Sequence, residues 1–358
     1  MLARSDDTKL SAVAIGRNNN FNLIRLIAAF AVLISHSFAL ALGTTDAEPL
    51  RKSLGVALGN IAVDVFFITS GFLVTASLLT RNNAAGFVRA RGLRILPALW
   101  TMLLLTVFGL GVLATSLSPT VYLSLPETYH YLAKNAALVT GVMYHLPGVF
   151  ETNPYKHVVN SSLWTLPYEL ALYAMLAAAW FVLRLPSTAR LLLFRIIVVG
   201  TALAAGVGLL VNHFYVETAS YFLRLLYMFA MGAALYLLRD RITLSRRWFW
   251  LVALVLALST LNKASFFVVY LFTVAYLLLY LAYVPAGRVR QYTRIGDYSY
   301  GVYLYAFPVQ QTIAAMVPGV TVWQMLVFAS AATMTLAALS WHFIEQPALR
   351  WKARSAVC

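Results

Sequence analysis

The sequence predicts an all-α fold, namely a polytopic membrane bundle of about ten transmembrane helices with both termini in the cytoplasm. Of the 358 residues, 61% are hydrophobic and only 11% are charged, whereas soluble domains carry about 25% charged residues. About ten apolar runs approach or exceed the roughly 20 residues that a helix needs to cross a bilayer. These properties exclude a soluble enzyme and a disordered chain, and they disfavour the short alternating strands of an outer-membrane barrel.

Each apolar run defines one expected span. The first twenty residues are polar, so we expect no cleavable signal peptide. The seventh run, 247–262, is the shortest, and the segment 132–146 is too short to cross a bilayer, so we expect it to be interfacial or extracytoplasmic. The ten expected spans are 21–43, 56–79, 95–115, 162–183, 191–212, 219–238, 247–262, 265–284, 296–316 and 321–343.

The basic residues predict the orientation of these spans. Of the 27 Lys and Arg, 20 fall in loops or termini on one side and 5 on the other, while Arg25 and Arg224 lie inside spans. The positive-inside rule places the side with 20 basic residues in the cytoplasm. The net charge of +15 is therefore mainly a topology signal, with membrane lipids as expected partners and no nucleic acid.

The spans divide the chain into a cytoplasmic tail, 1–20, a single transmembrane domain, 21–346, and a second cytoplasmic tail, 347–358. One long extracytoplasmic connection, 116–161, carries four prolines and is not expected to form one long helix. It either caps an outward-facing cavity or is an ordinary linker, and the sequence leaves both alternatives open. The only cysteine is Cys358, which excludes a disulfide within the chain, and no spacing of metal ligands is present.

Ionisable side chains inside spans are costly and are therefore candidates for function. Arg25 and His36 lie eleven residues apart in the first span, so they share one helix face about 16 Å apart along the axis. The alternatives are an Arg25 that reaches the cytoplasmic headgroups and a His36 that only packs.

Two carboxylates, Asp64 and Glu169, lie about two turns inside spans that enter from the outer side. Their depth matches that of His36, so we expect all three to converge in one outward-facing cavity. His36 would then act as a general base oriented by a carboxylate. Pairing of the carboxylates with Arg224, or simple contact between helices, is the alternative. The small residues Gly71 and Thr75 follow Asp64 on one face and predict close approach of another helix.

Arg91 and Arg94 lie one turn apart on the cytoplasmic side, directly before Ile95-Leu96-Pro97. Two guanidinium groups at this spacing suit bidentate binding of phosphate groups. The alternative is loop charge that serves only to set the topology.

Several segments, taken together, resemble the integral-membrane acyltransferase type 3 family. The first is Arg25, ten intervening residues and His36. One departure is Ala306, where many members have a histidine shortly before the proline of the ninth span; Gln310 and Gln311 follow it. The resembling segments are Phe21–Ala29, Val63–Leu73, Arg91–Pro97, Ser162–Glu169, Ile295–Leu304 and Phe343–Pro347.

The resemblance implies a ten-helix enzyme of the bacterial inner membrane that takes an acyl group, by default acetyl, from cytoplasmic acyl-CoA. The acceptor would be a hydroxyl of a surface or exported polysaccharide or glycolipid, with polysaccharide-biosynthesis machinery as a further partner. His36 would be the base or the acyl carrier, and Asp64 or Glu169 would orient it. Arg25, Arg91 and Arg94 would hold the CoA phosphates. The alternatives are a secondary transporter of a glycan or small acid and a lipid-linked glycosyltransferase.

Overall fold

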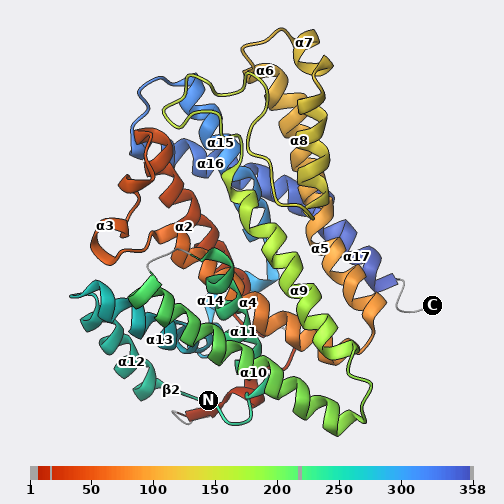
Figure 1. The fold of residues 1–358 in the computed structure, drawn as a ribbon, viewed down its shortest axis with the longest axis vertical. Coiled ribbons are helices and arrows are strands. Elements are labelled where there is room, and N and C mark those ends of the chain that lie inside the picture. The colour runs from red at the N-terminus through yellow and green to blue at the C-terminus, as the bar shows by residue number, and fades with distance from the viewer. Residues whose placement is uncertain (1–6, 17, 217–219, 355–358) are drawn as a thin grey trace.

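The computed structural model describes residues 7–16, 18–216 and 220–354, and these are almost entirely helical (Figure 1). The expected all-α class is confirmed. In the described part the only strands are β1 (Asp7–Lys9) and β2 (Thr243–Ser245), which pair antiparallel and join the start of the chain to a later loop. Residues 1–6, Arg17 and the end of the chain with Cys358 lie outside the described residues.

Each expected span contains a helix, and six helices of the described chain are long and apolar enough to cross a membrane. The protein is therefore a multi-pass membrane protein. The count of ten spans stays a prediction, because α9, α11 and α12 have 16, 17 and 14 residues, which is about 21–26 Å of helix. The helices are α2 (Phe21–Leu42), α4 (Leu58–Arg81), α5 (Ala84–Leu104), α9 (Leu166–Phe181), α10 (Ser187–Val211), α11 (Tyr221–Leu237), α12 (Arg246–Ser259), α13 (Lys263–Tyr283), α15 (Ser299–Met316) and α16 (Val322–Ser340).

Two helical segments extend well beyond the apolar runs that predicted them. α5 begins at Ala84 rather than at residue 95, so Arg91 and Arg94 lie inside a helix and not in a loop. After α16 the chain continues through a π-helical turn, η6 (Trp341–Glu345), into α17 (Gln346–Arg354), which packs beside α5. Much of the expected tail 347–358 is therefore helical and covers part of the bundle.

The remaining elements are short and connect the main helices. α5 continues through a π-helical turn, η2, into α6, and the connection 116–161 begins with α7 and α8. The shorter elements are α1 (Leu10–Val13), η1 (Thr45–Ala47), α3 (Arg51–Leu54), η2 (Leu105–Gly111), α6 (Val112–Ala114), α7 (Pro119–Ser124), α8 (Pro126–Ala137), η3 (Ser161–Thr165), η4 (Asn212–Val216), α14 (Arg288–Gln291) and η5 (Tyr292–Arg294).

The connection 116–161 is not one long helix, as expected. Proline stands at the first position of both α7 and α8, where its missing N–H costs nothing. The irregular chain that follows is fixed to α15, because Asn153 donates to the Gln311 carbonyl at 2.9 Å and Asn160 donates to the Leu304 carbonyl at 3.0 Å. In Figure 1 the connection forms the top of the molecule, away from both ends of the chain.

The closest helix contact is the crossing of α4 and α11. A Cβ atom at Gly71 would collide with the Phe229 carbonyl of α11, and a Cβ atom at Gly232 would collide with the Ile68 carbonyl of α4. The sequence prediction of close approach at Gly71 is confirmed. Small residues matter here because association of helices in a membrane depends on close packing rather than on hydrophobic burial.

We expect Gly71→Val to lower the stability of the folded protein by at least about 1–3 kcal/mol, since the new side chain has no space between two backbones. The measurement is the midpoint of thermal unfolding in detergent. Gly200→Ala is the matched control, because Gly200 lies in α10 with open space around it. An unchanged midpoint for Gly71→Val would show that the crossing is looser than described.

Candidate active site

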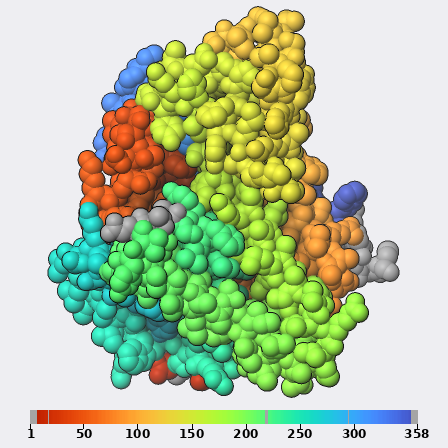
Figure 2. Space-filling model, in the orientation of Figure 1, coloured from red at the N-terminus to blue at the C-terminus, as the bar shows by residue number. Residues whose placement is uncertain are grey.

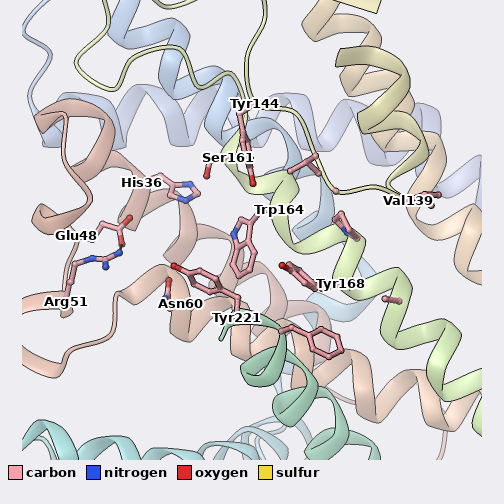
Figure 3. A pocket seen from close by; sticks show the side chains of 15 residues that line it. His36, Glu48, Arg51, Asn60, Val139, Tyr144, Ser161, Trp164, Tyr168 and Tyr221 are labelled. Atoms are coloured by element: carbon pink, nitrogen blue, oxygen red, sulfur yellow. Dashed lines mark hydrogen bonds and ion pairs between the residues drawn. The ribbon is translucent and has the colours of Figure 1, made fainter. Parts of the chain in front are cut away.

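A cavity of about 740 Å³ lies beneath the connection 116–161. Figure 2 shows a recess between the orange-red residues of α2 and α3 and the yellow-green residues of the connection. Val139, Gly141, Val142 and Tyr144 of the connection form one wall, so the connection lines the cavity. In Figure 3 the other walls come from α2, α4, α9 and α11.

His36 of α2 lines this cavity, and Figure 3 shows its ring directed toward the space beside Ser161 and Trp164. The ring meets Phe307 edge to face, with centroids 5.1 Å apart. Its Nδ1 atom is buried and has no hydrogen-bond partner among the described residues. No carboxylate of the described chain therefore orients His36 in this structure.

Asp64 does not line the cavity of His36. It is fully buried and accepts hydrogen bonds from Arg224 Nη2 at 2.5 Å, Arg224 Nε at 2.9 Å and the Tyr270 hydroxyl at 2.8 Å. The expected convergence of His36, Asp64 and Glu169 on one cavity is wrong, and the alternative of pairing with Arg224 holds for Asp64. The physical reason is that equal depth does not fix the direction in which each helix turns its side chain.

Glu169 lines a second, much smaller cavity of about 30 Å³, together with Arg25, Ser70, Tyr300 and others. Its carboxylate accepts hydrogen bonds from the Ser70 hydroxyl at 3.3 Å and from the Tyr173 hydroxyl. Neighbouring residues of the same segment line the two cavities: Trp164 and Tyr168 line the large one, whereas Glu169 lines the small one. The small cavity therefore lies beside the large one, and Arg25 belongs to the lining of the small cavity.

Arg25 and Arg94 are held by Asp297, in the loop before α15. Arg25 Nη1 lies 3.5 Å from Asp297 Oδ2, Arg94 also pairs with Asp297, and Arg94 Nη1 lies 3.8 Å from Glu345 Oε2. Sequence reasoning gave no role to Asp297 or Glu345, although both stand in segments that carry the family resemblance. Their position beside arginines of two other helices could not be read from spacing along the chain.

Arg91 differs from the other two arginines because it forms no ion pair with a carboxylate of the described residues. Its guanidinium lies 5.9 Å from the centre of the Tyr173 ring, and its Nε atom is buried without a hydrogen-bond partner. A buried donor without a partner is costly. The buried Nε of Arg25 also lacks a partner, so Arg91 is set apart by its missing ion pair. Arg91 therefore has both an unpaired charge and a buried donor for a bound anion, and phosphate fits it.

Comparison with known proteins assigns the chain to a family. A model of the family described as "Acyltransferase domain" matches residues 18–342. The chain belongs to the acyltransferase type 3 family. It is 31% identical over 364 aligned residues to "Nodulation protein 10" of Rhizobium leguminosarum bv. viciae, covering 94% of each chain. It is also 27% identical over 355 residues to the "O-acetyl transferase" of Shigella phage Sf6, covering 92% of this chain and 96% of that one.

No solved structure matches the chain. Family membership makes the protein a membrane O-acyltransferase and favours this class over the transport alternative. It also gives the ionisable groups within the spans an enzymatic context, because perturbed or buried titratable groups gather at active sites.

Gln310, which sequence reasoning left without a role, joins two helices of this acyltransferase beside the large cavity. Gln310 Nε2 donates to the Leu33 carbonyl at 2.8 Å and to the Ser37 hydroxyl at 2.7 Å, which ties α15 to the turns of α2 on either side of His36. Polar residues in an apolar span were the available signal. Ala306, where the family resemblance suggests a histidine, is fully buried and packs with Leu33 and Ala329.

The cavity also contains polar groups near its rim. Arg51 Nη2 lies 3.0 Å from Glu48 Oε2, and the Tyr144 hydroxyl belongs to the same lining. Burial raises the pKa of Tyr144, in the connection, above the ordinary value of a tyrosine. This hydroxyl is therefore protonated at neutral pH and is able to donate a hydrogen bond to a ligand.

Proposed function

We propose that the protein transfers an acyl group, most simply acetyl, from cytoplasmic acyl-CoA to a hydroxyl of a surface or exported polysaccharide or glycolipid. The observation that carries this proposal is a histidine, His36, on the wall of a large cavity that the connection 116–161 also lines. The name of the phage relative, an O-acetyl transferase, supports acetyl as the group transferred.

His36 serves as the general base in this proposal. As the acceptor oxygen bonds to the acyl carbon, the carbon–sulfur bond of the thioester breaks. The hydroxyl proton passes to the imidazole and from there to the departing thiolate, so the products are the ester and free CoA. Alternatively, His36 carries the acyl group between donor and acceptor. Asp64 and Glu169, proposed from the sequence as orienting groups, support the site through the helices they join rather than by contact with His36.

An aromatic wall supports a glycan as the acceptor. Trp164, Tyr168 and Tyr221 line the cavity beside polar groups such as Asn60. A sugar ring has apolar faces that pack on aromatic rings and hydroxyl groups that need hydrogen bonds, so a surface that combines both suits it.

The three arginines Arg25, Arg91 and Arg94 support a donor that carries phosphates. We place Arg91 in direct contact with the donor, because no carboxylate of the described residues pairs with it, and Arg25 and Arg94 in supporting positions through Asp297. The loop charges support both termini in the cytoplasm, and the organisms of the two relatives support a bacterial membrane. The three arginines would then face the donor pool, and the connection 116–161 would face outward. Polysaccharide-biosynthesis proteins would then supply the acceptor.

We expect Arg91→Ala to raise the KM for acetyl-CoA about tenfold or more with a smaller change in kcat, because a charge-assisted contact to phosphate is lost. Initial rates of acetyl transfer by purified protein in nanodiscs measure this. Arg184→Gln is the matched control, since Arg184 is exposed at the same predicted side and outside the group. A donor KM equal to that of the wild type would remove Arg91 from the donor site.

A further inference from the structure

A third cavity, of about 210 Å³, is separate from the two described above. It lies between the ends of α10 and α13, the side of α11 and the turn after α3, and we call it the α13 cavity. Its lining is mostly apolar. The apolar lining residues are Leu54, Val56, Leu209, Phe266, Phe267 and Leu271.

The polar lining of the α13 cavity is basic. His213, Arg224 and Lys263 all line it. Asp64 pairs with Arg224, but the bonds use Nε and Nη2 of the guanidinium, so Nη1 is the nitrogen left for a ligand. Lys263 forms no ion pair with a carboxylate of the described chain, and the His213 ring stacks on Phe267 with centroids 4.0 Å apart. Among the described residues that line it, this cavity therefore carries more positive than negative charge.

The start of α13 adds to the positive charge of the α13 cavity. Lys263 is the first residue of α13, a 21-residue helix, and the N-terminal end of a helix carries partial positive charge.

The α13 cavity is also a neighbour of the large cavity. Tyr221, one turn before Arg224 on α11, lines the large cavity of His36. A ligand in the α13 cavity would thus lie next to the cavity that we assign to the acceptor.

We propose that the α13 cavity binds the phosphate group of an amphiphile, that is, a phosphate ester attached to an apolar chain. Lys263, His213 and Arg224 supply the charge and the hydrogen-bond donors that phosphate requires. The apolar lining accommodates the first part of the chain. Both a bilayer phospholipid and a polyprenyl phosphate that carries the acceptor have this chemistry. The inference does not depend on the proposed acyl transfer.

The test uses the full chain in an uncharged maltoside detergent, with dodecyl phosphate as the probe and dodecanol and inorganic phosphate as comparison compounds. We expect dodecyl phosphate to raise the thermal unfolding midpoint saturably and more than either comparison compound. His213→Gln with Lys263→Gln should weaken its apparent affinity about tenfold, the scale of one charge-assisted hydrogen bond. Both side chains are exposed, so the unliganded midpoint should stay near that of the wild type.

Lys52→Gln is the matched control, because Lys52 is exposed on α3 and outside the cavity lining. An equal response of the double variant and the wild type, or no response to dodecyl phosphate, would overturn the proposal. A second arm compares nanodiscs that contain phosphatidylglycerol with nanodiscs that contain a polyprenyl phosphate. Stronger stabilisation by the first supports the proposal with a bilayer lipid as the ligand, and by the second supports it with a lipid-linked acceptor.

Discussion

His36→Ala is expected to lower acyl transfer at least about 100-fold, the smaller end of the range for a lost general base. The imidazole lines the 740 Å³ cavity, and an alanine in its place cannot take the hydroxyl proton. The other base of the lining, the Glu48 carboxylate, is paired with Arg51 at 3.0 Å. The measurement is acetyl transfer from labelled acetyl-CoA to a glycan acceptor in nanodiscs. Folding should be little affected, because the buried Nδ1 atom makes no hydrogen bond that the substitution would remove.

The control for this substitution is His130→Ala, because His130 is exposed on α8 and does not line the cavity. Its activity should equal that of the wild type. Stabilisation by a desulfo-CoA analogue should be retained in His36→Ala, which would separate a role in chemistry from one in donor binding. Activity of His36→Ala within a few-fold of the wild type would refute the assignment of the base.

Asp64→Ala is expected to cost about 3–5 kcal/mol of stability, because it leaves the Arg224 guanidinium without its buried counter-charge. The Tyr270 hydroxyl loses its acceptor at the same time. The measurement is the yield of folded protein and its thermal midpoint in detergent. Tyr270→Phe should cost less, about 1 kcal/mol, since it removes one hydrogen bond and no charge.

The double variant Asp64→Leu with Arg224→Leu is the control for this prediction. Replacing both members of a buried pair by apolar residues is often close to neutral, so most of the lost stability should return. If Asp64 acted on the substrate instead, Asp64→Asn would fold as stably as the wild type and still be inactive. That result would restore the catalytic role that the sequence first indicated for Asp64.

The helices of the bundle were predictable because the bilayer requires runs of apolar residues of a certain length. The sequence predicted α2 within one residue of its observed end at Leu42. It failed at the start of α5, where charged residues continue a helix beyond the apolar run. The hydropathy of a segment reports its contact with lipid, whereas the start of a helix is set by its capping residue. The cap of α5 is Asn83, whose side chain accepts a hydrogen bond from the Gly86 N–H.

The candidate site was predictable only in part, for a related reason. Periodicity along one helix placed Arg25 and His36 on a shared face, and both now line cavities, although two different ones. Asp297 as the partner of Arg94, and Gln310 as the tie to α2, join residues more than 200 positions apart. No spacing along the chain encodes such a pairing.

The sequence alone therefore determined the all-α membrane class and the family. The length of each apolar run, which bilayer thickness sets, and a set of short motifs can both be read from one chain. Only the tertiary structure decided that Asp64 pairs with Arg224 while His36 lines the large cavity. The depth of a residue follows from its position in its own helix, but the direction of its side chain depends on how neighbouring helices rotate and pack. The close crossing of α4 and α11 at Gly71 and Gly232 brings Arg224 to Asp64.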